Sequence, residues 1–148
     1  MTIYLASDHA GFELKNILAA FLKDAGHDVH DCGAATYDPE DDFNDYVRLS
    51  AQRVAKEPEA YGIILGGSGQ GEAMQANRYH GVRAALYYGG PEEILTLSRE
   101  HNDANVLSLA ARFLSAEEAK RAVTRWLDTP FSGVAKYGRR NDTLDSTE

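Results

Sequence analysis

The feature that most constrains this fold is a short apolar run followed by a glycine-rich turn. Residues 63–65 read Ile-Ile-Leu, and four of the next six residues are glycine, at positions 66, 67, 69 and 71. A run of this length that stops at glycines is typical of a buried strand ending in a tight turn. Glu72 then opens a helical segment, whose free amides favour negative charge. The stretch therefore predicts a cradle for an anion, or for a ligand that gains negative charge during a reaction.

Segments with strand and helix patterns alternate along the whole chain. After the apolar run Ile3–Ala6, apolar residues recur every three or four positions from Leu14 to Ala25, which is helical spacing. The expected strands cover residues 3–6, 27–32, 62–65, 83–88 and 106–110, with helices between them and after the last. Such alternation predicts an α/β fold with helices on both faces of a parallel sheet. We expect a doubly wound, five-stranded parallel sheet in the order 2-1-3-4-5, built as one domain from residues 1–148.

Two polar loops that contain glycine follow the first and third expected strands. One loop carries Asp8 and His9, and the other is the glycine turn with Ser68 and Glu72. In a doubly wound sheet, ligands bind at the carboxyl ends of the strands where the strand order reverses. We therefore expect the two loops to meet and form a site. Asp8 could equally cap a helix, Glu72 could serve a helix dipole, and Ser68 could be an ordinary turn serine; spacing leaves these alternatives open.

Composition and motif spacing exclude several classes of function. A net charge of −8 argues against nucleic acid or an anionic membrane as the main partner, and no apolar run approaches a membrane span of ~20 residues. The single cysteine, Cys32, fits a reducing compartment, so we expect a cytoplasmic protein. The glycine spacing matches neither the dinucleotide fingerprint nor the P-loop. His27 and His30 lie near Cys32 without a second ligand cluster, so we expect no metal. The acidic run 38–45 is typical of a solvated loop and helix start.

Further candidates lie outside the two loops. His101 and Asn102 end an expected helix, where both residue types are common for structural reasons. Arg112 follows the fifth expected strand at the same edge as the glycine turn, where it could bind a phosphate. A polar tail follows Pro130 and contains Lys136, Arg139 and Arg140. These cations could be solvated, or they could hold an anion in another subunit.

Together these residues resemble the type B ribose-5-phosphate isomerases, the family that includes the galactose-6-phosphate isomerase subunits. The matching stretches run in order and at family spacing, at residues 7–15, 62–72, 76–77, 81–84 and 99–105. The resemblance implies a Rossmann-like three-layer sandwich that forms homodimers, with a tetramer left open, and active sites between subunits. It implies interconversion of D-ribose 5-phosphate and D-ribulose 5-phosphate by metal-free proton transfer through a cis-enediolate, without a cofactor. The alternatives are a tetrose, allose or galactose phosphate as substrate, or a sugar-phosphate-binding protein without catalysis.

The resemblance also assigns catalytic roles. One branch of the family uses a cysteine as base at the position of Gly66, and that cysteine is absent here. The other branch uses a glutamate at the position of Glu72, which is present. By the same resemblance, Ser68 would carry a proton between the two substrate oxygens, and His101 would assist ring opening.

Substrate-binding roles come from the same comparison of residues. They fall on Gly67, Gly69, Gly71, Asp8, His9, Asn102, Arg112, Lys136 and Arg140. The glycine amides would stabilise the enediolate, while Asp8 and Asn102 would contact sugar hydroxyls. His9 and Arg112 would hold the phosphate group.

The C-terminal segment from about residue 130 would reach the partner subunit and complete the phosphate site there. The family places two arginines four residues apart in this segment, whereas this chain has Lys136 first and Arg140 second, with Arg139 beside it. Lysine offers a point charge where arginine offers a fork of donors. Asn44 also stands where a proline is common in the family, within the acidic loop.

Overall fold

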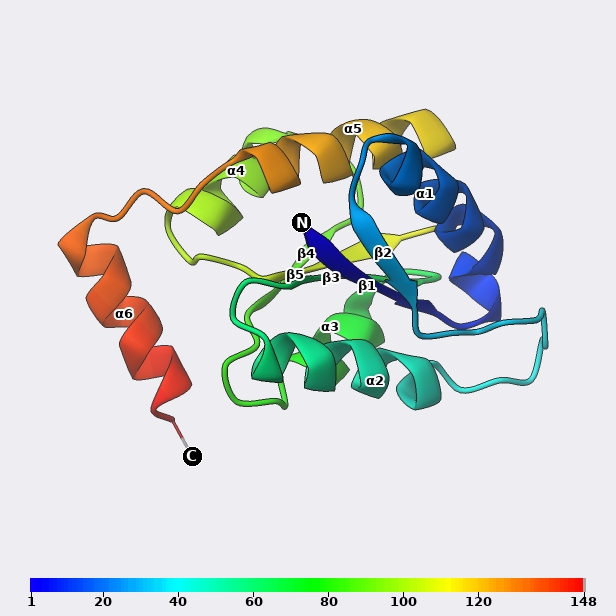
Figure 1. Cartoon of the computed structure of the whole chain (residues 1–148), viewed down its shortest axis with the longest axis horizontal. Coiled ribbons are helices and arrows are strands. Elements are labelled where there is room, and N and C mark those ends of the chain that lie inside the picture. The colour runs from blue at the N-terminus through cyan, green and yellow to red at the C-terminus, as the bar shows by residue number, and fades with distance from the viewer. Residues whose placement is uncertain (148) are drawn as a thin grey trace.

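A computed structural model describes residues 1–147 as one parallel sheet with helices on both faces (Figure 1). The strands are β1 (Thr2–Ser7), β2 (Asp28–Asp31), β3 (Tyr61–Gly66), β4 (Ala84–Tyr87) and β5 (Val106–Ala110). The helices are the 3₁₀ turn η1 (His9–Gly11), then α1 (Phe12–Asp24), α2 (Phe43–Lys56), α3 (Gln70–Ala76), α4 (Glu93–Glu100), α5 (Ala116–Asp128) and α6 (Ala135–Asp145). All strand pairs are parallel, so the predicted doubly wound, five-stranded α/β fold is confirmed.

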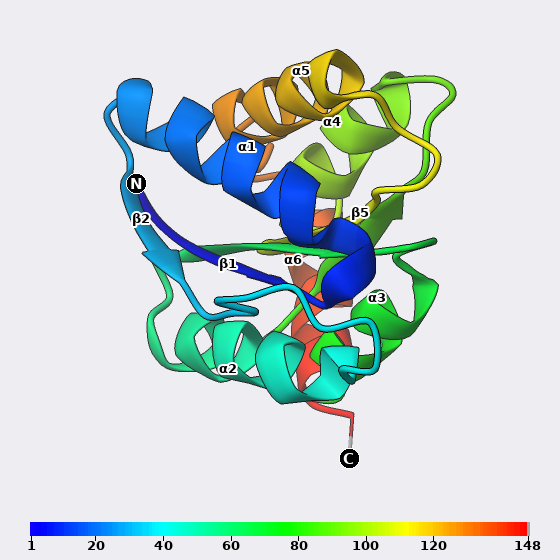
Figure 2. The ribbon, with the colours of Figure 1, turned by 90° about the vertical axis from the view of Figure 1, so that its right-hand side faces the viewer.

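Helices α1, α4 and α5 cover one face of the sheet, and α2 and α3 cover the other (Figure 2). Each face has its own apolar core. Under α1 and α5 the largest buried side chain is Trp126, and the helical spacing of Leu14, Leu18 and Leu22 buries one side of α1. Under α2 the core is smaller and includes Val47. No helix formed by residues 1–147 is long and apolar enough to cross a membrane.

Short local signals set the starts of two helical segments. The Asp8 carboxylate accepts a hydrogen bond from the backbone N–H of Ala10 at 3.0 Å and so caps η1. The Ser115 hydroxyl accepts from the N–H of Glu118 at 3.1 Å, and the Glu118 carboxylate accepts from the N–H of Ser115 at 2.7 Å. This reciprocal pair is a capping box, and it fixes the start of α5.

The observed strand order is 2-1-3-5-4, so the predicted order 2-1-3-4-5 is wrong for its last two strands. β5 lies between β3 and β4, with Gly66 opposite Ala110, and β4 forms the edge of the sheet. Periodicity identifies both strands but does not say which of them pairs with β3, because parallel right-handed crossovers permit either order. The N–H of Arg112 consequently donates to the carbonyl of Gly67 at 3.1 Å, which puts the end of β5 directly beside the glycine turn.

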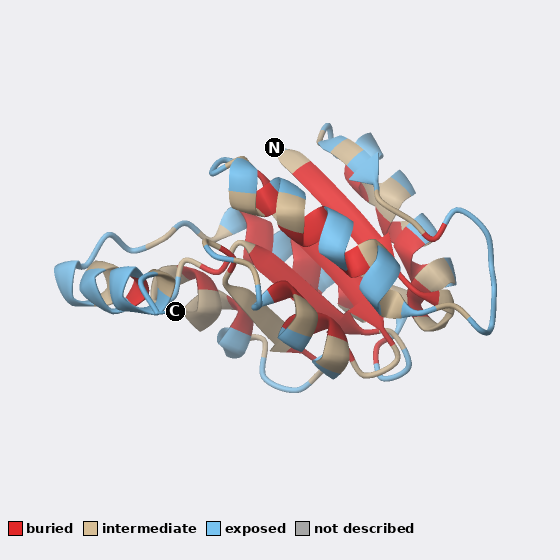
Figure 3. Ribbon diagram, turned by 90° about the horizontal axis from the view of Figure 1, so that it is seen from below, coloured by how far each residue is buried: buried red, intermediate tan, exposed pale blue. Residues whose placement is uncertain are grey.

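The chain after α5 forms a further helix, α6, where sequence analysis predicts only a polar tail. α6 extends away from the sheet, and most of its residues are exposed (Figures 1 and 3). Asp145 on α6 pairs with the guanidinium of Arg83 at 2.7 Å. The buried side chain of Asn141 donates to the carbonyl of His101 at 3.1 Å, and the ring of Tyr137 stacks on that of His101 with 4.1 Å between centroids. These contacts tie α6 to the segment that follows α4.

Candidate active site

The glycine turn between β3 and α3 is packed tightly against the neighbouring strands. Gly69 has a φ of +74°, in the left-handed region that favours glycine, and a β-carbon there would press on Leu86 and on the backbone of Leu109. The hydroxyl of Ser108, on β5, donates to the carbonyl of Gly69 at 2.6 Å. Ser68 lies within the turn, half-buried, with its hydroxyl 3.3 Å from the side-chain oxygen of Gln70. The glycines therefore permit a close approach of backbone to backbone that larger residues would prevent.

Glu72, in the first turn of α3, is a buried carboxyl group whose side chain folds back over Gly66. The residue is 5% exposed, and a β-carbon on Gly66 would overlap its carboxyl group. Burial raises the pKa of Glu72, a hydrogen bond with its own backbone N–H lowers it, and the negative charge of Asp8 raises it further. A carboxylate with a raised pKa binds a proton more readily than an ordinary one, which suits a general base.

The same overlap has a consequence for position 66. A cysteine side chain there could not coexist with Glu72 in its present conformation, since one of the two would have to move. The absence of a side chain at Gly66 is therefore a condition for the placement of the Glu72 carboxyl group.

His9 follows Asp8 at the carboxyl end of β1 and is paired with an acid from a distant loop. Its ring Nδ1 is 2.7 Å from Oδ1 of Asp41, and its backbone N–H donates to the same oxygen at 3.0 Å. The hydrogen bond that the His9 ring donates to Asp41 raises the pKa of His9, partial burial lowers it, the charge of Asp8 raises it, and the charge of Arg112 lowers it. His9 is thus biased toward its cationic form.

Asp41 is the site residue that sequence reasoning missed. The acidic run is predicted to be solvated, and Asp38, Asp42 and Asp45 are indeed exposed. The prediction is wrong for Asp41, whose side chain is only 5% exposed because it is turned inward against His9. Nothing in the spacing of the run distinguishes Asp41 from its neighbours, since its partner is 32 residues away in the chain.

Asp8, His9 and Asp41 could also be considered as metal ligands. One potential ligand atom from each lies within 4.8 Å of the others. Two ligand atoms on a tetrahedral zinc ion, each about 2.0–2.1 Å from the metal, are about 3.3 Å apart. The 2.7 Å between Nδ1 of His9 and Oδ1 of Asp41 is shorter and fits a charge-assisted hydrogen bond. A metal would have to separate the pair.

Arg112 completes the polar groups at this edge of the sheet. A β-carbon on Gly67 would be 3.2 Å from one guanidinium nitrogen of Arg112, so the guanidinium lies over the glycine turn. The charge of the Arg112 guanidinium is close enough to lower the pKa of His9. Among residues 1–147, no carboxylate lies within salt-bridge distance of Arg112. The Arg112 guanidinium and the His9 ring thus lie near one another at this edge of the sheet.

The other predicted site residues lie at the opposite edge of the sheet. His101 and Asn102 precede the amino end of β5, whereas the glycine turn adjoins its carboxyl end. A five-residue strand spans about 13 Å between its first and last residue. Lys136 and Arg140 are exposed on α6, which is attached at the His101 edge (Figure 1). Within one chain, Asp8, His9, Glu72 and Arg112 therefore lie together at the glycine turn. The four residues at the opposite edge are remote from that turn.

The segment that carries His101 is held rigidly by two arginines that sequence reasoning did not single out. Arg83 donates to the carbonyl of Asn102 at 2.9 Å and to the carbonyl of Asp103 at 3.0 and 3.1 Å. The buried Arg99 donates to the carboxylate of Asp103 at 2.9 Å. Asp103 has a φ of 45°, in the left-handed region, so these contacts stabilise a strained turn directly after His101.

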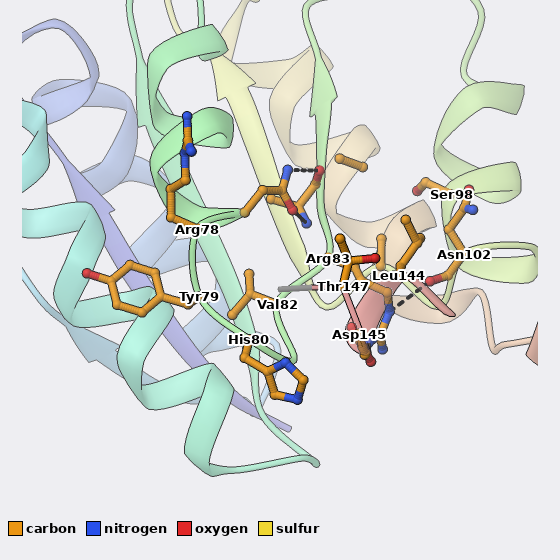
Figure 4. A pocket seen from close by; sticks show the side chains of 14 residues that line it. Arg78, Tyr79, His80, Val82, Arg83, Ser98, Asn102, Leu144, Asp145 and Thr147 are labelled. Carbon is orange, nitrogen blue, oxygen red and sulfur yellow. Dashed lines mark hydrogen bonds and ion pairs between the residues drawn. The ribbon is translucent and has the colours of Figure 1, made fainter. Parts of the chain in front are cut away.

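A cavity of about 580 Å³ lies at this second edge, near the end of α6 (Figure 4). Figure 4 shows Tyr79 and His80 on one side of it and Asn102, Leu144 and Asp145 on the other. Its lining contains no residue of the glycine turn. The cavity is therefore separate from the cluster around Glu72, although it includes the predicted sugar ligand Asn102.

Known proteins resemble this chain over nearly its whole length. The family model described as Ribose/Galactose Isomerase matches residues 3–144. A relative named ribose-5-phosphate isomerase B, from Mycolicibacterium paratuberculosis, is 41% identical over 148 residues, which are 100% of this chain and 92% of the relative. A protein of the same name from Mycobacterium tuberculosis (strain ATCC 25618 / H37Rv) is 39% identical over 100% of this chain and 90% of its own length.

Solved structures agree with this resemblance. Ribose-5-phosphate isomerase B from Mycoplasma genitalium, determined with bound ribulose-5-phosphate, has a TM-score of 0.92 and 37% identity over 97% of this chain and 93% of that one. A ribose 5-phosphate isomerase from Thermotoga maritima has a TM-score of 0.91 and 38% identity over 99% and 98% of the two chains.

Proposed function

Because the chain belongs to the ribose/galactose isomerase family, we propose that it is an enzyme that interconverts D-ribose 5-phosphate and D-ribulose 5-phosphate. The observation that carries this proposal is the buried carboxyl group of Glu72, with its raised pKa, beside a glycine turn. The names of the full-length relatives and the ribulose-5-phosphate in one similar structure support the choice of substrate.

In the proposed reaction, Glu72 moves one proton between two carbon atoms. Its carboxylate takes the proton from C2 of the open-chain aldose, and the electrons of that C–H bond form the C1–C2 double bond of a cis-enediolate while the negative charge moves to O1. Ser68 carries a proton between O2 and O1, and the protonated Glu72 returns its proton to C1. The ketose then has its carbonyl at C2, with no net loss of atoms or electrons and no need for a metal or cofactor.

The raised pKa of Glu72 assists both halves of this transfer, because a general base works best when its pKa is near the working pH. The amides of Gly67, Gly69 and Gly71 would stabilise the oxyanion. Asp8, whose charge is close enough to influence Glu72, would contact a sugar hydroxyl.

The phosphate group would be bound between His9 and Arg112. These two groups are close enough for the charge of Arg112 to oppose protonation of His9. An anion next to both relieves that repulsion and gains two charge-assisted hydrogen bonds. Since Arg112 pairs with no carboxylate among residues 1–147, its guanidinium is free for this role.

A second copy of the chain would supply the remaining groups. Within one chain His101 lies at the opposite edge of the sheet from Glu72, and α6 extends outward from that edge. In a homodimer, His101 and Asn102 of one subunit would assist ring opening and contact sugar hydroxyls in the site of the other. The C-terminal segment from about residue 130 would bring Lys136 and Arg140 to the phosphate.

The experiment is a comparison of kcat/KM for ribose 5-phosphate with that for tetrose, allose and galactose phosphates, carried out in deuterated water. We expect ribose 5-phosphate to be the best substrate and solvent deuterium to enter it at C2. A faster reaction of another sugar phosphate would show that this other sugar phosphate is the preferred substrate of the same isomerisation. Binding of ribose 5-phosphate without deuterium uptake would reject catalysis and favour a sugar-phosphate-binding protein.

A further inference from the structure

The pair formed by Asp41 and His9 connects the predicted phosphate site to a loop that has no assigned role. Oδ1 of Asp41 accepts two hydrogen bonds from His9, one from ring Nδ1 at 2.7 Å and one from the backbone N–H at 3.0 Å. The side chain of Asp41 is 5% exposed, whereas that of His9 is 25% exposed. The acid is therefore the inner, fixed partner and the imidazole is the partner that still meets solvent.

This arrangement determines which ring nitrogen is available to a ligand. A carboxylate only accepts hydrogen bonds, so Nδ1 of His9 must carry a proton. Nε2 lies on the other side of the ring, and no residue among 1–147 makes a hydrogen bond or ion pair with it. A phosphate oxygen needs a donor, so His9 can bind it through Nε2 only as the doubly protonated cation.

The charges around His9 compete, and Asp41 is the group that decides the balance. Asp8, on its own segment, has a carboxylate oxygen 3.9 Å from Nδ1, and Arg112, after β5, opposes the positive charge. The ring of Tyr37, in the loop between β2 and α2, packs edge-on against the His9 ring, with 6.3 Å between the two ring centroids. Since the Asp41 carboxylate is almost completely buried, a neutral His9 would leave it without a charge partner, and buried unpaired charge is strongly unfavourable.

Oδ2 of Asp41 adds to this imbalance. It is buried and has no hydrogen-bond partner among residues 1–147. A carboxylate that is satisfied on one oxygen only depends more heavily on that single partner. The His9 ring is therefore the cationic partner of Asp41, while Tyr46 on α2, whose pKa is raised by burial and by the nearby Asp41 carboxylate, is a second titratable group beside it.

We propose that Asp41 is a positioning residue for phosphate recognition, which holds His9 as a cation with Nδ1–H on its carboxylate and Nε2–H directed to the phosphate group of the substrate. Asp41 itself does not touch the substrate. Because Asp41 belongs to the loop between β2 and α2, phosphate binding depends on that loop being docked against β1. This inference rests on the proposed function only in taking a phosphate group as the ligand.

The direct test is an NMR titration of the histidine rings, with the His9 signals assigned by their loss in His9→Asn. In the unsubstituted protein we expect the neutral form of His9, reached at high pH, to carry its proton on Nδ1. In Asp41→Asn we expect the pKa of His9 to fall by at least about one unit. Glu40→Gln is the matched control, since Glu40 is the exposed acid next to Asp41, and it should leave the pKa of His9 unchanged. An Nε2–H neutral form, or an equal pKa in Asp41→Asn, would overturn the proposal.

A second measurement separates positioning from general damage to the fold. For Asp41→Asn we expect KM for the sugar phosphate, and the dissociation constant of inorganic phosphate, to rise about tenfold at pH 8 and far less at pH 6, with kcat changed less than about threefold. Asp41→Glu, which keeps the carboxylate, should recover part of the affinity. Equal losses at both pH values, or a loss confined to kcat, would contradict the role.

The two proposals fail separately. If the protein does not isomerise ribose 5-phosphate, the proposed function is rejected, while the titration of His9 and the binding of inorganic phosphate still decide the role of Asp41. If Asp41→Asn does not fold, the protonation state of Nδ1 in the unsubstituted protein decides it.

Discussion

The two edges of the sheet carry the two halves of the proposed site, and they are built by different means. At the carboxyl edge, the loops after four of the five strands converge, and three acids, Asp8, Asp41 and Glu72, are buried there close to one another. At the amino edge, His101 projects from a turn that is fixed by Arg83 and Arg99, and the exposed helix α6 is attached to it. The carboxyl edge therefore holds buried acids around a proposed ligand site, whereas the amino edge holds His101 and the mostly exposed helix α6.

One chain thus holds only half of the proposed site at each edge of its sheet. The carboxyl edge has the proposed base and the two side chains proposed to bind the phosphate, yet the groups proposed for ring opening are about 13 Å or more away along β5. If both edges act on one substrate, a second subunit would have to bring them together. The four predictions below test this division, in order of decreasing effect.

The largest effect is expected from removing the buried carboxylate. Glu72→Gln keeps the shape of the side chain and removes its basicity, so we expect kcat to fall about 10²–10⁴-fold, while the affinity for the sugar phosphate changes little. Steady-state assays and a binding titration measure the two effects. Glu93→Gln is the matched control, because Glu93 also lies in the first turn of a helix but is exposed. Turnover of Glu72→Gln within tenfold of normal would rule out Glu72 as the base.

The division of the site between subunits is tested by mixing two inactive variants. A heterodimer of Glu72→Gln and His101→Ala has one intact site if each site combines Glu72 of one subunit with His101 of the other. After equal mixing and subunit exchange, half the dimers are heterodimers, so activity should return to about a quarter of normal. If both residues act within the same chain, every site remains defective and mixing restores nothing.

The rigidity of the amino edge is tested at Arg83, whose guanidinium joins the His101 segment to α6. Arg83→Met removes the donors to the carbonyls of Asn102 and Asp103 and the pair with Asp145. We expect kcat/KM to fall about tenfold and stability to fall by about 1–3 kcal/mol. Arg53→Met, which removes an exposed arginine, is the control for loss of charge. Unchanged kinetics in a destabilised Arg83→Met would show that the segment need not be held rigidly.

The smallest effect is on stability at the carboxyl edge. The pKa of Glu72 is raised by burial, so the folded chain binds its proton more tightly than the unfolded chain. Stability is therefore lost as pH rises from the ordinary carboxyl pKa through the raised one. Glu72→Gln should escape this loss, with a melting temperature about 2–4 °C higher at pH 8 and no advantage at pH 4. Thermal unfolding at the two pH values checks this, and a constant difference would refute the linkage to Glu72.

The parts of the fold that could be predicted are those that depend on neighbours in sequence. Apolar runs locate the strands, Ser115 and Glu118 mark a helix start, and the residues after β1 and β3 meet because parallel strands share an edge. The order of β4 and β5 could not be predicted, since both are short apolar runs and right-handed crossovers permit either order. α6 was missed because its mainly polar sequence has no apolar stripe, and its contacts with Arg83 and His101 lie 40 to 62 residues away in the chain.

The same physical reason explains which site residues were found. Glu72, Asp8 and Arg112 lie in the segments that follow strand ends, where topology alone places them at the edge expected to bind a ligand. Asp41 stands in a run of acids, and only its burial against His9 distinguishes it. Contacts between distant loops depend on the closed fold and leave no periodic signal in the chain.

The overlap between position 66 and the Glu72 carboxyl group bears on how such enzymes diverge. A side chain at position 66 and a carboxyl group seated over that position exclude each other, so the effect of either substitution depends on the residue at the other site. A lineage that exchanges a thiol base at position 66 for a carboxylate base at position 72 would thus cross an intermediate with both groups in collision or with neither. Such epistasis would slow the exchange, in either direction, between the two branches that the resemblance implies.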